Sequence, residues 1–184
     1  TVFMAIVIGI IFFLTGIIFS GNIATLLGAN KQVYHMTSIY LKVLLMFGPA
    51  FVLNNVMNAF VRNDGNPRLS MIAMLVGSFG NIILDYLLVI KFSMGMFGAV
   101  LATGFSPIMG LMVLSGHIVS ENSNIKFKVA KIRASFIKSI IMLGIPSFVA
   151  EMSSGIVIFV FNIIILDLQG NVGVAAYGVI ANLA

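Results

Sequence analysis

The chain has 184 residues, of which 60% are hydrophobic and 8% are charged, and its mean hydropathy is +1.16. These numbers exclude a soluble globule, because too few polar side chains are present to cover one, and they indicate a membrane protein. We therefore interpret the formal net charge of +5 in terms of which side of a bilayer the basic residues occupy, and not as a sign of nucleic-acid binding. Cysteine is absent, which excludes disulfides and thiolate metal sites. Because the sequence has no initiator methionine and starts and stops inside apolar runs, we expect it to be part of a longer protein.

The first predicted element is a transmembrane helix. Residues 1–30 carry no charge, and the run from Val2 to Phe19 approaches the roughly 20 residues that cross a hydrocarbon core. Small residues recur along it, and we expect them to allow close packing against other helices rather than to bind a ligand. These residues are Gly9, Gly16, Gly21 and Gly28.

The second predicted helix runs from about Met36 to Val61 and contains a Gly-Pro pair. We expect a kink at Gly48 and Pro49, since proline removes a backbone hydrogen bond and clashes with the preceding turn. Asn54 and Asn58 follow the kink and share a helical face. Two interpretations stay open for this pair: the amides line a cavity, or they bond to a neighbouring helix.

Residues 70–104 contain the most informative side chains. The polar turn 62–68 leads into a predicted helix to Ile90, a turn follows, and another helix runs from about Phe97 to Val119. Asp85 lies inside the first of these helices, where a carboxylate costs roughly 2.5 to 3.5 kcal/mol on insertion scales and therefore marks a candidate functional site.

Two partners for Asp85 follow from spacing. Asn81 lies one helical turn before Asp85, and Thr103 lies as far from the turn as Asp85 does, at a depth of about 9 Å for ~1.5 Å of rise per residue. A carboxylate, an amide and a hydroxyl are hard oxygen ligands, so the pocket suits a proton or a small cation better than it suits a soft metal. The alternative is a buried carboxylate that only bonds helices together.

Three stretches of the sequence resemble the multidrug and toxic compound extrusion (MATE) transporters: RNDGNPR, NIILDYLLV and GMFGAVLATGFS. The Gly-Pro pair at Gly48 and the Gly-Ile-Pro stretch that begins at Gly144 fit the same pattern. The resemblance implies an all-α polytopic helix bundle, here the third to about the eighth helix of a twelve-helix, two-lobe transporter. It also implies that Asn81, Asp85 and Thr103, with the carbonyl of Ala99, bind the coupling proton or sodium ion. The family's further aspartate, on the first helix, lies outside this sequence.

The resemblance further implies a domain division. Residues 1–119 would form four helices of the amino-terminal lobe, 120–139 a cytoplasmic linker, and 140–184 the start of the carboxy-terminal lobe. Loops 62–69 and 120–139 together hold seven Lys or Arg residues, whereas the opposite side of the membrane holds three: Lys31, Lys42 and Lys91. Because basic residues concentrate in cytoplasmic loops, we expect both loops in the cytoplasm.

A second membrane acid, Glu151, lies in the predicted helix 140–166, before a turn at 167–171. We expect it to face a cavity or a partner, and some MATE proteins use an acid on this helix. With Asn54 and Asn58 it forms a candidate second coupling or substrate site. His117 lies near a membrane boundary, where we expect a solvated or capping role rather than a proton relay.

No pattern for a nucleophile, a phosphate loop or a clustered metal site appears, so we do not interpret the chain as an enzyme and expect no cofactor beyond the coupling ion. The favoured function is ion-coupled export, by antiport across the cell membrane, of lipophilic, cationic small molecules. Two alternatives remain: a related lipid-linked oligosaccharide flippase, or a non-transporting membrane scaffold or channel subunit. The expected partners are the lipid bilayer and the remaining helices of the same polypeptide, and no nucleic acid.

Overall fold

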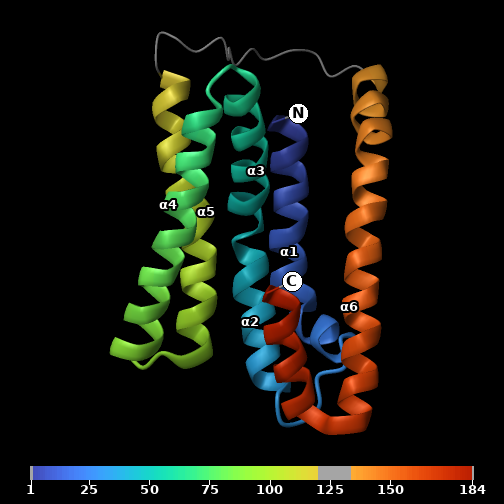
Figure 1. Ribbon diagram of the computed structural model, residues 1–184. Coiled ribbons are helices and arrows are strands. Elements are labelled where there is room, and N and C mark those ends of the chain that lie inside the picture. The colour runs from blue at the N-terminus through green and yellow to red at the C-terminus, as the bar shows by residue number, and fades with distance from the viewer. Residues whose placement is uncertain (1, 120–133, 184) are drawn as a thin grey trace. The chain divides into compact units, whose positions relative to one another are not determined.

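The computed structural model describes residues 2–119 and 134–183, and within these ranges every regular element is a helix (Figure 1). Two units, one comprising α1 to α5 and the other α6, are described separately. The elements in chain order are α1 (Val2–Leu26), α2 (Tyr34–Met46), α3 (Gly48–Asn63), α4 (Pro67–Asp85), the π-helical segment η1 (Tyr86–Lys91), α5 (Gly95–Val119) and α6 (Ala134–Leu183). The predicted all-α fold class is confirmed.

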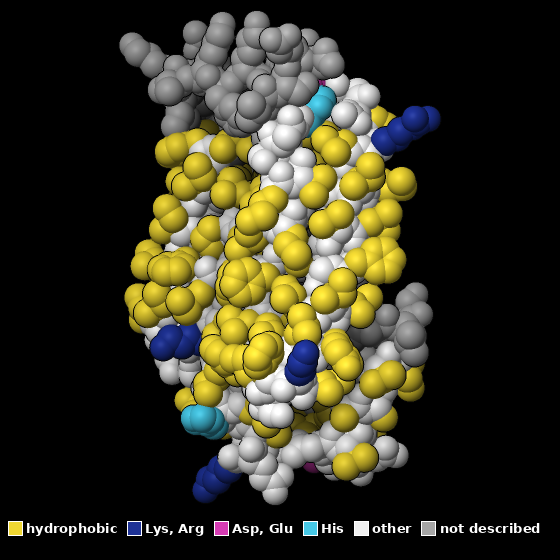
Figure 2. All heavy atoms as spheres, turned by 90° about the vertical axis from the view of Figure 1, so that its left-hand side faces the viewer, with side chains coloured by type: hydrophobic (Ala, Val, Ile, Leu, Met, Phe, Trp, Pro, Cys, Tyr) yellow, Lys and Arg dark blue, Asp and Glu magenta, His cyan; other side chains and the backbone are white. Residues whose placement is uncertain are grey.

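The helices are long and apolar enough for a multi-pass membrane protein. Among the described residues four helices meet the length and hydropathy of a membrane span, or five if the bent pair α2 and α3 forms one span. Hydrophobic side chains cover the face seen in Figure 2, and Lys and Arg side chains lie toward its two ends. This distribution is the one expected of a bundle surrounded by lipid, where charged heads extend to the aqueous interfaces.

The predicted kink in the second span is confirmed. The axes of α2 and α3 differ by 46°, and the break falls between Met46 and Gly48, with Pro49 in the first turn of α3. Proline is tolerated there because the first amides of a helix have no intrahelical acceptor.

Glycines of α1 allow this bent pair to pack closely. A Cβ atom added to Gly9 would lie 2.7 Å from the Cα of Pro49, and one added to Gly16 would lie 2.5 Å from the Cβ of Leu45. Both distances are shorter than real carbon contacts, so only glycine fits. The packing role predicted for these residues is confirmed, whereas Gly28, with φ of 86°, lies beyond the end of α1 in a turn.

The helices α4 and α5 form an antiparallel hairpin in which α4 begins at a well-defined cap. Asn66 Oδ1 accepts a hydrogen bond from the Leu69 amide at 3.1 Å, which is a typical N-cap. Farther along, Ser106 Oγ donates to the carbonyl of Gly77 at 2.9 Å, so the two helices contact each other directly there. A small core cluster of buried residues joins α3, α4 and α5; its members are Met57, Val61, Ala73 and Leu114.

The α6 unit differs in its bounds from the prediction. Helix α6 begins at Ala134, six residues before the expected start at Ile140, because the polar Ser135 and Lys138 are exposed and a helix accommodates them. Of the expected linker, residues 120–133 lie outside the described residues. The predicted turn at 167–171 is confirmed by Gly170, whose φ of 65° and ψ of −159° interrupt the helix.

After Gly170 the chain of α6 folds back on itself, as Figure 1 shows. The ring of Tyr177 stacks on that of Phe161, with centroids 5.7 Å apart. The long apolar segment that ends at Ala181 is therefore two antiparallel helices rather than one span.

Candidate functional site

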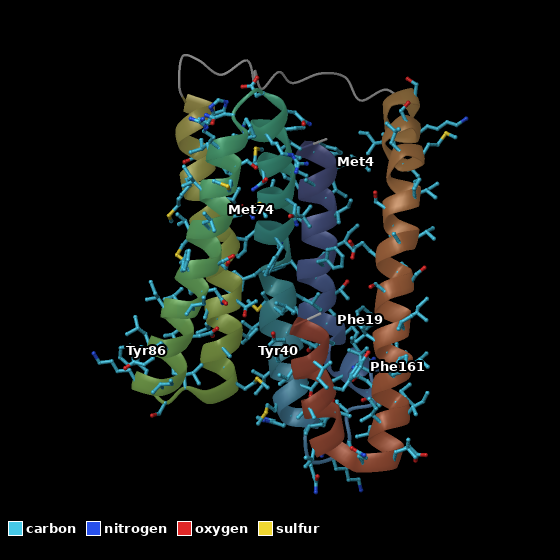
Figure 3. All side chains as sticks on the ribbon, viewed as in Figure 1. Met4, Phe19, Tyr40, Met74, Tyr86 and Phe161 are labelled. Carbon is cyan, nitrogen blue, oxygen red and sulfur yellow. The ribbon has the colours of Figure 1, made fainter. Side chains whose placement is uncertain are left out.

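Asp85 is the last residue of α4 before the π-helical segment η1. Its side chain is partly buried, and its Oδ1 atom is buried with no hydrogen-bond partner in the described structure. Tyr86, labelled in Figure 3 toward the end of this helix, is exposed. A π-helical turn inside or at the end of an α-helix often marks a functional site, because it changes the register of the side chains that follow.

Asn81 lies one turn before Asp85 on the same helix, as the spacing predicts. Its Nδ2 group is also buried without a partner. An unpaired buried polar group costs about 1–3 kcal/mol, so two of them one turn apart are a feature to be explained. The Asn81 amide can present either its oxygen or its nitrogen, because the two ends of an amide group are nearly indistinguishable in shape.

The register of α4 against α5 places the other two candidates opposite this pair. Gly77 contacts Ser106 through the hydrogen bond described above, and a Cβ atom added to Gly98 would lie 3.0 Å from the Leu88 carbonyl. Asn81 and Asp85 lie between Gly77 and Leu88, and Thr103 and Ala99 lie between Ser106 and Gly98. All four candidates therefore fall within one window of the α4–α5 interface.

Within that window, the residues of α4 and α5 that lie at equal depth along the helix pair differ by about one turn from the prediction. Counting from the Gly77–Ser106 contact, Asn81 is level with Thr103, and Asp85 is level with Ala99. The equal depth predicted for Asp85 and Thr103 is therefore wrong by a turn. The reason is that α5 begins at Gly95, two residues earlier than expected, while η1 extends the preceding helix to Lys91.

Thr103 and Ala99 are joined to each other. Thr103 Oγ1 donates a hydrogen bond to the Ala99 carbonyl at 3.0 Å, one turn back on α5. This is the common local bond of a helical threonine, and it leaves both oxygens with lone pairs available.

The four groups suit an oxygen-bound cation or a proton. They offer a carboxylate, an amide, a hydroxyl and a carbonyl, which are ligands that hard cations prefer. No group of three or more His, Asp or Glu side chains with metal-binding geometry occurs within residues 2–119 and 134–183. The buried and unpaired Oδ1 of Asp85 is the observation that fits a positive partner.

A second polar feature is a cavity of about 380 Å³ between α3, α4 and α5. Both interpretations of the asparagine pair hold here. Asn54 and Asn58 line the cavity, while Asn58 Nδ2 also donates to the Ser70 carbonyl at 3.3 Å and its Oδ1 accepts from Ser70 Oγ. Asn54 Oδ1 is buried without a partner. The other polar lining residues are Asn55, Arg62, Ser78 and Ser106.

Glu151 lies on α6 and is exposed within its unit. It borders an apolar hollow of about 280 Å³ together with Phe148, Met152 and Phe159. Asn54 and Asn58 belong to the other unit, so the grouping of Glu151 with them stays a prediction.

Of the solvated or capping role predicted for His117, the solvated part is wrong. Its side chain is only 7% exposed, and its Nε2 atom lies 2.9 Å from Oδ2 of Asp64, which is 10% exposed. From the sequence, both Asp64 and Asn66 belong only to the polar turn 62–68. Nothing in the sequence spacing shows that α5 returns to this turn 53 residues later.

Comparison with known proteins gives related membrane exporters. Residues 1–87 match the family model described as MatE. The multidrug export protein MepA of Staphylococcus aureus (strain bovine RF122 / ET3-1) is 31% identical over 181 residues, which cover 97% of this chain and 40% of MepA. MepA of Staphylococcus saprophyticus is 29% identical over the same shares.

Solved structures show the same fold. A multidrug resistance MATE family transporter in an inward-facing conformation superposes with a TM-score of 0.87 at 25% identity, covering 96% of this chain and 41% of that one. An outward-facing MATE structure gives a TM-score of 0.79 at 25% identity, over 97% and 40%. The chain thus spans about two fifths of the length of these relatives.

Proposed function

We propose that this chain, which is similar to MATE transporters, forms part of a secondary active exporter driven by a proton or sodium gradient. MepA, its relative, is described as a multidrug export protein. The proposed substrates are lipophilic, cationic small molecules, and the proposed location is the cell membrane with multiple spans.

One observation carries the coupling site: the unpaired, buried Oδ1 of Asp85 beside the unpaired Nδ2 of Asn81. Each such group costs about 1–3 kcal/mol until a partner arrives. A proton or a sodium ion supplies the missing positive partner and neutralises the carboxylate. A state that binds the ion more tightly then becomes more populated, which is how ion binding biases a conformational equilibrium.

A proton and a sodium ion would require different numbers of these residues. A proton requires only Asp85, whereas sodium requires several oxygens held together. Thr103 Oγ1 and the Ala99 carbonyl, already held by their mutual bond, supply two such oxygens level with Asn81 and Asp85. We propose that this window of the α4–α5 interface binds either ion.

We further propose that the cavity between α3, α4 and α5 contributes to the substrate path. Its lining alternates apolar residues such as Phe51 and Met74 with the amides of Asn54 and Asn58. These amides are the groups that would hydrogen-bond to a polar part of the substrate, although the Oδ1 atom of Asn54 itself is buried against Gly110 of α5. Glu151 is proposed as a second acid, facing the remaining helices of the full-length protein.

Transport is tested with the full-length protein in sealed proteoliposomes. An imposed proton or sodium gradient should drive accumulation of a fluorescent lipophilic cation, and unlabelled dye should exchange with it by counterflow. Protein-free vesicles carrying the same gradient are the control. Absence of both uptake and counterflow in folded protein would assign the chain to a scaffold or channel subunit instead.

The proposed orientation needs a separate measurement. The contact of His117 with Asp64 puts the turn 62–69 and the end of α5 at the same end of the unit, as the distribution of basic residues predicts. We propose that this end is cytoplasmic. Single cysteines at Asn63 and Ser123 should react with an impermeant maleimide only in inverted vesicles; labelling of both in intact cells would reverse the orientation.

A further inference from the structure

A buried cluster of three polar side chains joins the ends of three helices, away from the Asp85 window. Asp64 follows α3, Asn66 caps α4, and His117 lies in the last turn of α5. His117 Nε2 lies 2.9 Å from Asp64 Oδ2, and His117 Nδ1 lies 3.4 Å from Asn66 Nδ2. We call these three residues the end cluster.

The N-cap fixes which way the Asn66 amide points. Its Oδ1 accepts the Leu69 amide at 3.1 Å, so the group that faces His117 is the Nδ2 amine, which can only donate. His117 Nδ1 must therefore carry a lone pair. The hydrogen of the neutral ring then resides on Nε2, where it is donated to Asp64 Oδ2. The geometry assigns a neutral imidazole in the Nε2–H tautomer.

Among the described residues of α3 and α4, three charged groups lie in the turn that His117 contacts. Asp64 is the acid that bonds to it, and the cations Arg62 and Arg68 are both exposed. Helices α1 and α5 contain no other ionisable side chain. A proton added to the ring therefore meets a carboxylate on one side and an amine on the other.

We propose that the end cluster is a proton-responsive latch on the start of α4. One proton from the adjoining aqueous phase binds at His117 Nδ1, and no other bond to hydrogen breaks. The resulting imidazolium strengthens the pair with Asp64 but opposes the Asn66 amine. Asn66 relieves this conflict by turning its oxygen toward Nδ1–H, which releases the Leu69 amide and uncaps α4.

The latch acts on the helix that carries Asn81 and Asp85. It therefore makes α4 sensitive to the pH at this end of the bundle without a change at the coupling site. Histidine suits this role because it is the side chain that changes charge between about pH 5 and 8. The inference concerns a conformational response and stands whether or not the chain transports.

The ring state is measured directly in the full-length protein. Imidazole ¹⁵N shifts in lipid bilayers without substrate or gradient should show the Nε2–H tautomer for His117 at pH 8. Amide hydrogen exchange across residues 66–70, corrected for intrinsic rates, should show a protection at Leu69 that falls several-fold on acidification. His35→Gln, at an exposed histidine in α2, is the control and should leave this fall unchanged.

Two variants separate a latch from a merely structural cluster. His117→Gln keeps a donor toward Asp64 and cannot be protonated, so protection at Leu69 should no longer depend on pH. Asn66→Asp keeps an acceptor for the cap and turns the partner of Nδ1 into an acceptor, so the protonated ring of His117 should persist to higher pH than in the wild type.

Three results would overturn the latch. They are an Nδ1–H tautomer at pH 8, an unchanged pH dependence of Leu69 protection in His117→Gln, and no upward shift in Asn66→Asp. If His117→Gln fails to fold, the tautomer and the Asn66→Asp titration decide the question, since neither requires that variant. None of these measurements depends on transport.

Discussion

Two carboxylates in the α1–α5 unit differ in how their charges are met. Asp64 lies at the end of the bundle and is paired with His117, which is itself bonded to Asn66. Asp85 lies within a predicted membrane span, and its buried Oδ1 has no partner. A paired group stabilises one arrangement, whereas an unpaired one is stabilised when something binds. The unpaired carboxylate is therefore the better candidate for exchange with an ion.

The largest expected effect is at the unpaired acid. Asp85→Asn in the full-length protein should abolish ion-coupled efflux and leave folding intact, because asparagine keeps the shape and cannot change charge. It also removes the cost of a buried carboxylate, so the melting temperature should be equal or higher. Dye efflux in proteoliposomes and thermal melting are the measurements.

The control for this change is Asp167→Asn, at an exposed acid before the Gly170 break, which should transport as the wild type does. Normal efflux by Asp85→Asn would remove the functional half of the comparison. Asp85 would then be a structural carboxylate like Asp64.

Hydropathy was sufficient to find Asp85 but not the end cluster. An acid inside an apolar run is visible in sequence, and helical spacing then indicates Asn81. The pairing of His117 with Asp64 depends on how α5 packs against a turn 53 positions earlier in the chain, which no local pattern encodes. The kink at Pro49 is likewise predictable from local sequence, whereas the depth of Thr103 relative to Asp85 depends on how α5 packs against α4.

The next prediction tests which ion neutralises Asp85. Thr103→Val removes the hydroxyl that bonds to the Ala99 carbonyl and is nearly isosteric. If sodium is bound, its affinity should fall about tenfold or more, since the loss of about 1.4 kcal/mol has that effect. If protons alone couple, transport should survive with a shifted pH dependence. Sodium binding is measured by calorimetry.

Thr15→Val is the matched control for this test. Thr15 Oγ1 makes the same bond to the carbonyl one turn back, at 2.8 Å from Ile11 O, but on α1. Its replacement should alter neither the sodium affinity nor the pH profile. If Thr103→Val behaves in the same way as Thr15→Val, Thr103 does not belong to the site.

Replacing the paired acid, Asp64, should have the opposite effect to replacing Asp85: stability should fall and ion coupling should remain. Asp64→Ala leaves the buried His117 Nε2–H without this acceptor and should lower the free energy of unfolding by about 1–3 kcal/mol. The folded fraction should still couple efflux to the ion gradient. Asn63→Ala, at the exposed neighbour, is the control and should change stability little. Loss of coupling at unchanged stability would reverse the roles assigned to the two carboxylates.

The smallest expected effect concerns a neutral pair at the same end of the bundle. Ser70 is 3% exposed, and its hydroxyl donates to Asn58 Oδ1 while its carbonyl accepts from Asn58 Nδ2. Ser70→Ala should therefore cost about 1 kcal/mol of stability, less than Asp64→Ala because no charge is involved. Ser78→Ala, at an exposed serine lining the same cavity, should be close to neutral in thermal melting. Equal melting temperatures for the two serine variants would show that Asn58 gains nothing from the α3–α4 bond and that its place is set by the cavity alone.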